Sequence, residues 1–192
     1  MSKKVLHQFS EGAAPGDAIT GQMLSIRQWL RDEGYTSDIF AASIHPALQG
    51  EVSDALRYRP KLGEAQVVYH HSIGSTVADQ LRQQRARLLL IYHNVTPPEF
   101  FQQSDPGLAA QLQRGIDQLP LLCPHTALAL GDSTYNTAAL VEAGFPCTGT
   151  LPLPLDAAQY QFADDPAVLA TLADRTPLLL YVGRLAPNKR QD

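Results

Sequence analysis

The sequence lacks several features that would place it in a class at once. It has two cysteines in 192 residues, Cys123 and Cys147, and they form neither a CxxC pair nor a metal-ligand spacing. We therefore expect no disulfide framework and interpret both as small buried residues in a reducing cytoplasm. No apolar run approaches the ~20 residues of a membrane-spanning helix. The amino terminus also lacks the longer apolar region of a secretory signal.

An excess of basic residues is also missing. The chain has 15 Lys and Arg against 19 Asp and Glu, a formal net charge of −4, and it contains no run of basic residues. Nucleic acid is therefore not an expected partner. The apolar fraction of 44% is ordinary for a globular protein, and the length allows one large domain, or one domain with part of another.

Apolar runs of strand length alternate with helical patterns along the chain. Several runs are continuously apolar, which is typical of parallel strands covered on both faces. The pattern predicts an α/β fold, a Rossmann-like open and mostly parallel sheet with helices on both faces. The expected strands are Val5–Phe9, Asp38–Ala41, Gln66–Tyr69, Leu88–Tyr92, Ala127–Leu130 and Thr148–Leu153.

Three helices have recognisable ends. The first is expected from Asp17, a good N-cap, to Gly34, a good C-terminal glycine, with an apolar stripe at Ile19, Met23, Ile26 and Leu30. A second is expected from Ser133 to Gly144, and a short third from Asp165 to about Ala173. The proline-rich segment 151–155 is interpreted as the extended exit from the first domain.

Polar residues follow the predicted strands at the edge where ligands bind to open α/β sheets. The loop from Phe9 to Asp17 contains Gly12 and Gly16, but its spacing is neither GxGxxG nor a P-loop, and it could be a flexible connector. His71 and the pair His93-Asn94 end two successive strands. Histidine can exchange a proton near neutral pH, and asparagine can hold a ligand hydroxyl.

Two simpler interpretations of the histidines stay open. They could cap loop backbone groups without any chemical role. They could also bind a metal through His70, His71 and His93, although no acidic or cysteine partner stands at a supporting spacing. We therefore expect no metal site.

The last residues contain the most informative motif. Leu178–Val182 is predicted to be a buried parallel strand, followed by Gly183 and by the cations Arg184 and Lys189. Cations and glycine at the carboxyl end of a strand suit a phosphate or diphosphate ligand. The alternative is an ordinary turn with solvated side chains.

Together these motifs resemble the family-4 retaining glycosyltransferases, which have the two-domain GT-B fold. The resemblance rests on the Gly12–Asp17 loop, the strand-end pair Tyr92-His93, the segment Leu130–Asn136 and, most specifically, Tyr181–Arg190. It covers essentially the whole chain but about half of a family member. It implies an acceptor-side domain at 1–155, a linker and helix at 156–176, and the start of a donor-binding domain at 177–192.

The resemblance also implies a function. A sugar would be transferred from a nucleotide-sugar donor to a hydroxyl of a carbohydrate or lipid-linked acceptor, with retained configuration and without a metal or other cofactor. Arg184 and Lys189, with Gly12 and Gly16, would hold the donor diphosphate. The chain alone would be inactive, would be cytoplasmic with peripheral membrane contact as an option, and could self-associate through its tail.

His93 would be the catalytic residue by the same resemblance. His71, Asp17 and Asn94 would lie on the acceptor side. The loop departs from the family by having Gly12-Ala13-Ala14-Pro15-Gly16 in place of a Gly-Gly pair, which leaves the acceptor contacts open. Two other functions fit the sequence, namely a stand-alone module that binds a small anion and a sugar-nucleotide epimerase of the same architecture.

Overall fold

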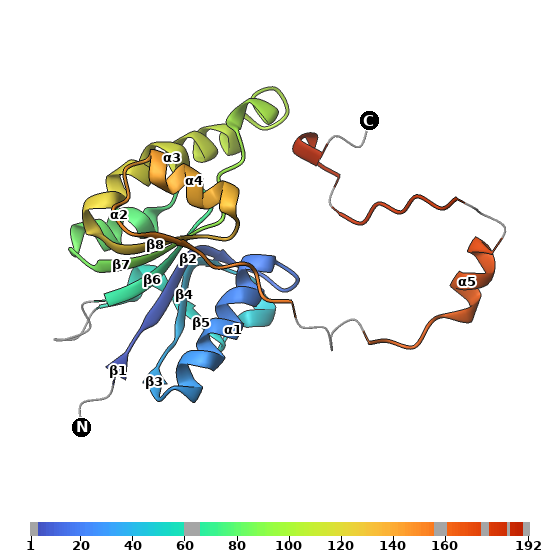
Figure 1. Cartoon of the computed structure of the whole chain (residues 1–192), viewed down its shortest axis with the longest axis horizontal. Coiled ribbons are helices and arrows are strands. Elements are labelled where there is room, and N and C mark those ends of the chain that lie inside the picture. The colour runs from blue at the N-terminus through green and yellow to red at the C-terminus, as the bar shows by residue number, and fades with distance from the viewer. Residues whose placement is uncertain (1–3, 60–65, 156–160, 174–176, 184, 190–192) are drawn as a thin grey trace. The chain divides into compact units, whose positions relative to one another are not determined.

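A computed structural model describes residues 4–59, 66–155, 161–173, 177–183 and 185–189 of the chain. Its contacts divide it into two units, Met1–Leu153 and Pro154–Asp192, which are described separately. Figure 1 shows the first unit as a twisted sheet with helices packed against it.

Seven strands of the first unit form one parallel sheet, in the order β5-β4-β2-β6-β7-β8-β9. The strand order reverses between β2 and β6, as it does in doubly wound sheets. A separate two-stranded pair is formed by β1 (Lys4–Val5) and β3 (Tyr35–Thr36). The strands of the large sheet are β2 (His7–Ala13), β4 (Ile39–Ile44), β5 (Val52–Asp54), β6 (Gln66–His71), β7 (Arg87–Tyr92), β8 (Thr126–Gly131) and β9 (Thr148–Thr150).

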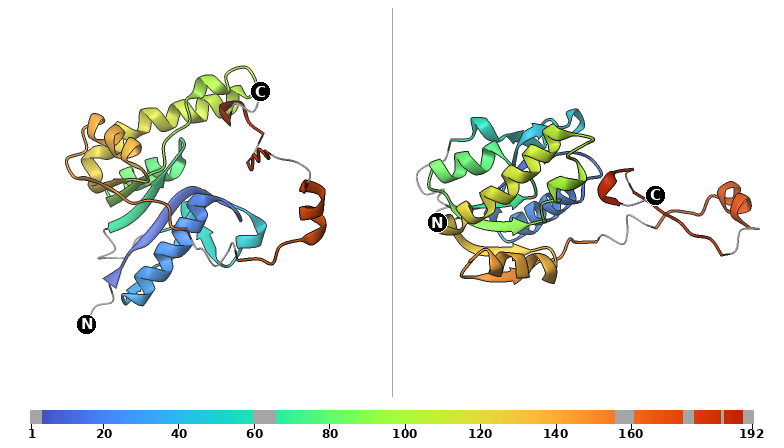
Figure 2. Two further views of the ribbon diagram at one scale, coloured as in Figure 1. Left: turned by 45° about the vertical axis from the view of Figure 1, so that its right-hand side comes forward. Right: turned by 90° about the horizontal axis from the view of Figure 1, so that it is seen from above.

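Helices cover both faces of this sheet, which confirms the predicted α/β Rossmann-like fold. Figures 1 and 2 show α1 (Ala18–Asp32), in blue, on one side of the sheet. The other side carries α2 (Thr76–Gln83), α3 (Pro106–Leu122) and α4 (Thr134–Glu142), in green to orange. We call these the α1 face and the α3 face.

The helix ends follow from local chemistry. The Asp17 carboxylate accepts the Thr20 N–H at 2.9 Å and begins α1, and Gly34 follows its end with φ +80°. Ser133 caps α4 in the same way. Sequence analysis predicted both helices but missed α2 and α3, although Ser75 and Asp105 cap them.

The two faces differ in how well they are filled. On the α3 face, a large cluster of buried apolar residues includes Phe9, Tyr69, Leu90 and Leu122, all 0% exposed. On the α1 face, Met23 packs against the β4 side of the sheet, in a smaller cluster.

Some predicted boundaries need correction. The first predicted strand extends further, so Gly12 lies in β2, where it pairs with Ser43, and not in the loop. The strand predicted to end at Leu153 ends at Thr150. The two cysteines are not buried, since Cys123 is half-buried and Cys147 is exposed.

The second unit contains α5 (Pro166–Leu172), which Asp165 caps as predicted. The prediction of a buried strand at Leu178–Val182 is wrong, because these residues pair with no strand and Leu179 is 95% exposed. A β-strand needs a neighbour to satisfy its backbone groups, and the described residues of this unit include no strand. In the part of the chain that the structure describes, no helix is long and apolar enough to cross a membrane.

Candidate functional site

The carboxyl edge of the sheet continues past the strand ends. The His93 N–H donates to the His71 carbonyl at 2.9 Å, and the Asp132 N–H donates to the Tyr92 carbonyl at 3.2 Å. Because side chains alternate along an extended chain, His93 falls on the same face as Ile91, and Asp132 on the same face as Leu130. Both side chains therefore belong to the α1 face.

A chain of buried polar groups reaches His93 from α1. Gln8 Nε2 donates to the carbonyl oxygen of Met23 at 2.8 Å, and Gln8 Oε1 lies 3.1 Å from His70 Nε2. His70 Nδ1 lies 3.0 Å from His93 Nε2, and the two rings stack at 5.3 Å. Gln8 and His70 are at most 1% exposed, so this chain is sealed from solvent.

Asp132 stands on the other side of His93. Its Oδ2 lies 3.7 Å from His93 Nδ1, and its Oδ1 accepts a hydrogen bond from Asn136 Nδ2 of α4. The His93 side chain is 3% exposed and that of Asp132 is 18% exposed. A ligand at this edge would therefore reach Asp132 before His93.

Opposing effects act on the charge of His93. Burial is the largest and lowers the pKa of the imidazole below its ordinary value. The negative charges of Asp132 and Asp17 act in the opposite direction. Asp17 acts from the exposed N-cap position before α1, where its carboxylate also accepts the Thr20 hydroxyl at 2.9 Å.

His71 lies apart from this group. It is 0% exposed on the α3 face, where its Nε2 lies 2.8 Å from the Gly115 carbonyl oxygen of α3. Burial lowers its pKa to about 4. The His71 side chain does not meet that of His93, because successive strand residues point to opposite faces and His70 makes that contact. The expected acceptor-side role of His71 stays a prediction.

Asn94 directly follows His93 and is exposed, with φ +67°. Its Oδ1 accepts the Val95 N–H at 2.8 Å and lies 3.3 Å from the Tyr92 hydroxyl oxygen. These contacts shape the turn beside His93. The expected contact of Asn94 with an acceptor stays a prediction.

The two glycines that sequence analysis placed in the first loop have different backbone requirements. Gly16 has φ +75°, so it makes the turn that precedes Asp17. Gly12 has no such constraint, since a Cβ there would meet nothing closer than the Ser43 carbonyl oxygen at 3.9 Å.

The two cations expected to hold the donor, Arg184 and Lys189, belong to the second unit. Lys189 is exposed at the end of a 3₁₀ turn, Pro187–Lys189. Arg184 lies outside the described residues.

Three residues of the site were not among the predicted site residues. Asp132 could have been found, because it directly follows a predicted strand. His70 is adjacent to the chosen His71, and choosing between them requires the strand register. Gln8 gives no sequence signal, since it lies in the middle of a strand.

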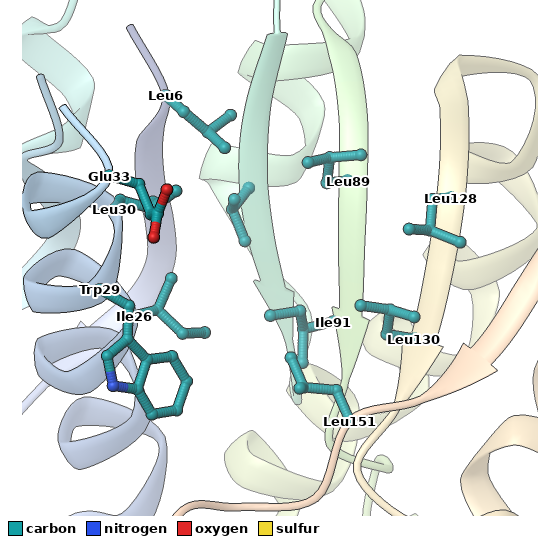
Figure 3. Close-up of a pocket in the computed structure, with 11 residues that line it drawn as sticks. Leu6, Ile26, Trp29, Leu30, Glu33, Leu89, Ile91, Leu128, Leu130 and Leu151 are labelled. Atoms are coloured by element: carbon teal, nitrogen blue, oxygen red, sulfur yellow. The ribbon is translucent and has the colours of Figure 1, made fainter. Parts of the chain in front are cut away.

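An apolar groove of about 280 Å³ lies on the same face as His93. Figure 3 shows Trp29 and Ile26 of α1 on one side, and Leu89, Ile91 and Leu130 of the sheet on the other. Trp29 is 50% exposed. The groove exists because α1 covers one part of this face and leaves β7 and β8 partly exposed.

The arrangement can hold hydroxyl groups and exchange a proton, because Asp17, Asp132 and His93 are hydrogen-bond acceptors or titratable groups. Among the described residues, no three His, Cys, Asp or Glu side chains group together as a metal site would require. A scan against protein-family models found no match for this chain, and neither did searches of the curated proteins and of the solved structures.

Proposed function

We propose that the first unit is the acceptor-side domain of a retaining glycosyltransferase that uses a nucleotide-sugar donor. One observation carries the proposal: at the carboxyl edge of the sheet Asp132 lies 3.7 Å from His93, and the negative charge of Asp17 before α1 acts on the same imidazole. Asp17 begins the helix that follows β2, beside the point where the strand order reverses. Open α/β sheets bind their ligands at this place.

The charges at this edge favour the acceptor over the donor phosphates. Carboxylates accept hydrogen bonds from sugar hydroxyls and repel phosphate groups. Asp17 directly follows Gly16, so a diphosphate beside that glycine would meet a like charge. We therefore assign the donor diphosphate to Arg184 and Lys189, and the acceptor hydroxyls to this edge.

His93 fits the chemistry of the transfer. The acceptor oxygen bonds to the anomeric carbon as the bond to the diphosphate breaks, the diphosphate leaves with the electron pair, and the hydroxyl gives up its proton. Burial lowers the pKa of His93 and so favours the neutral imidazole, which can take up positive charge as the reaction proceeds.

The test is a ligand titration of the whole chain followed by NMR, with neutral oligosaccharides, nucleotide sugars and inorganic phosphate as separate probes. Oligosaccharides should shift the amide signals of Asp17, His93 and Asp132. His93→Ala should weaken that binding about tenfold or more. His125→Ala is the matched control, because His125 lies just before β8, at the opposite end of that strand from Asp132.

A transfer assay on the same samples separates the alternatives. Because the chain alone is expected to be inactive, no radiolabelled sugar should move from donor to acceptor, and robust transfer would overturn the two-domain interpretation. Conversion of the nucleotide sugar without an acceptor would replace the proposal with an epimerase. Phosphate binding at this edge with no response to saccharides would replace it with an anion-binding module.

A further inference from the structure

The buried hydrogen bonds fix which nitrogen of His70 carries a proton. The Met23 carbonyl can only accept, so the amide nitrogen of Gln8 must point toward it, and the amide oxygen must face His70. That oxygen is also an acceptor, so His70 Nε2 must carry a proton and donate it. Burial keeps His70 neutral, because its pKa lies well below the ordinary value. Its Nδ1 is therefore unprotonated.

The same reasoning extends to His93. Because His70 Nδ1 accepts, His93 Nε2 must be the donor in the 3.0 Å contact. Neutral His93 then has its lone pair on Nδ1. That atom is buried and has no hydrogen-bond partner among the described residues. The nearest carboxylate oxygen is Asp132 Oδ2, at 3.7 Å.

Two hydrogen-bond acceptors, His93 Nδ1 and Asp132 Oδ2, thus face each other without a hydrogen bond between them. The contacts on either side of this pair are hydrogen bonds. Asn136 holds the far side of Asp132, and His70 holds the far side of His93, so neither group can turn away without breaking a partly buried contact. A proton on Nδ1 would turn this 3.7 Å contact into an ion pair. A closer approach of Asp132 would then make it a charge-assisted hydrogen bond, which is about twice as strong as a neutral one.

We propose that His70 is a positioning residue that holds His93 in its Nε2–H form, so that Nδ1 accepts the proton and Asp132 balances the resulting charge. The charged and titratable groups that act on His93 are Asp132 after β8, Asp17 before α1, His70 of β6 and, from the opposite face of the sheet, His71. The use of this proton in sugar transfer rests on the proposed function. The assignment of the proton to a particular nitrogen of His93 rests only on the hydrogen bonds.

The proposal is tested by ¹⁵N NMR of histidine-labelled protein at pH 7.5, which distinguishes protonated from unprotonated ring nitrogens without any substrate. In the unmodified protein, His93 should show a protonated Nε2 and an unprotonated Nδ1. A protonated Nδ1 in neutral His93 would overturn the proposal before any variant is made.

Two substitutions of His70 separate positioning from a structural role. His70→Leu removes the acceptor, so His93 should move its proton to Nδ1 and donate to Asp132. His70→Asn places an amide oxygen near the position of Nδ1, so it should restore the Nε2–H form. His71→Asn is the control, since it disturbs an equally buried neighbour on the opposite face and should leave the His93 signals unchanged. An unchanged His93 tautomer in folded His70→Leu would refute the positioning role.

The role of Asp132 has its own readout. Asp132→Asn removes the balancing charge, so the titration midpoint of His93 should fall by about one pH unit or more. An unchanged midpoint would refute the pairing of Asp132 with the proton. Because both measurements need no ligand, they can fail while sugar binding succeeds, or succeed while it fails.

Discussion

The two faces of the central sheet are made by the same strands but differ in packing and in polar content. The α3 face carries three helices and a continuous apolar core in which Tyr69, Leu88 and Leu90 are 0% exposed. Among the described residues, the α1 face carries α1, an open apolar groove and the polar chain that leads to His93. One face supplies most of the packing, and the other holds the groups that can act chemically.

Two consecutive histidines show what this difference does to identical side chains. His70 and His71 are both almost completely buried, and burial lowers the pKa of both. His71 contacts a helix carbonyl of Gly115, which anchors α3 to the sheet. His70 contacts His93, which ends at the sheet edge. The face of the sheet on which a histidine lies, and not the residue type, therefore decides whether it contacts helix α3 or the His93 side chain.

The largest expected effect is the difference in stability loss between alanine substitutions at two neighbouring leucines of β7. Leu90→Ala should destabilise the protein by about 3–4 kcal/mol, because Leu90 is 0% exposed in the core of the α3 face. Leu89→Ala should cost about 1 kcal/mol, because Leu89 lines the groove. Urea unfolding of both variants measures the difference. Equal losses would show that the α1 face is as tightly packed as the other.

Acid should destabilise the fold through its buried histidines. The pKa of His71 falls from 6.5 to about 4 on folding, so between these values the unfolded chain binds a proton that the folded chain does not. The stability is present above pH 6.5, and about 3 kcal/mol is lost as the pH falls toward 4.

The variant His71→Asn isolates that contribution. It should be less stable than the unmodified protein at pH 7.5, and the gap should narrow as the pH approaches 4. Thermal unfolding across this pH range measures the gap. A gap that stays constant with pH would mean that His71 titrates normally in the folded protein.

Replacing two helical glycines by alanine should change the stability of the protein in opposite directions. In Gly115→Ala the new Cβ would lie 2.7 Å from the backbone nitrogen of Gly74, so this contact between α3 and the loop before α2 must open, at about 2–3 kcal/mol. In Gly21→Ala of α1 the Cβ meets nothing within 4 Å, and the better helix propensity should stabilise the protein by up to about 1 kcal/mol. Calorimetric melting of both variants checks the signs, and a loss in both would show that α1 is packed as closely as α3.

The fold could be predicted from the sequence because its signals are local. Apolar runs give the strands, and the Asp17 and Ser133 caps give two helices. The strand predicted at Leu178–Val182 failed because an apolar run forms a strand only beside a partner. Apolar content alone could not supply that condition.

The candidate site was harder to predict, because it depends on register. His93 could be recognised, since it directly follows a strand. Whether it meets His70 or His71 depends on which residues of β6 and β7 lie side by side, and the pairing of His70 with Ile91 decides it. A shift of one residue would exchange the two histidines between the faces.

The backbone bonds that carry His93 and Asp132 beyond their strands have a consequence for ligand recognition. Residues in loops usually lose conformational entropy when they are ordered by a ligand. Here the amides of both residues are already bonded to the carbonyls of neighbouring strands. Binding at this edge would therefore order little of the backbone, and the entropy of fixing these two residues has already been lost during folding.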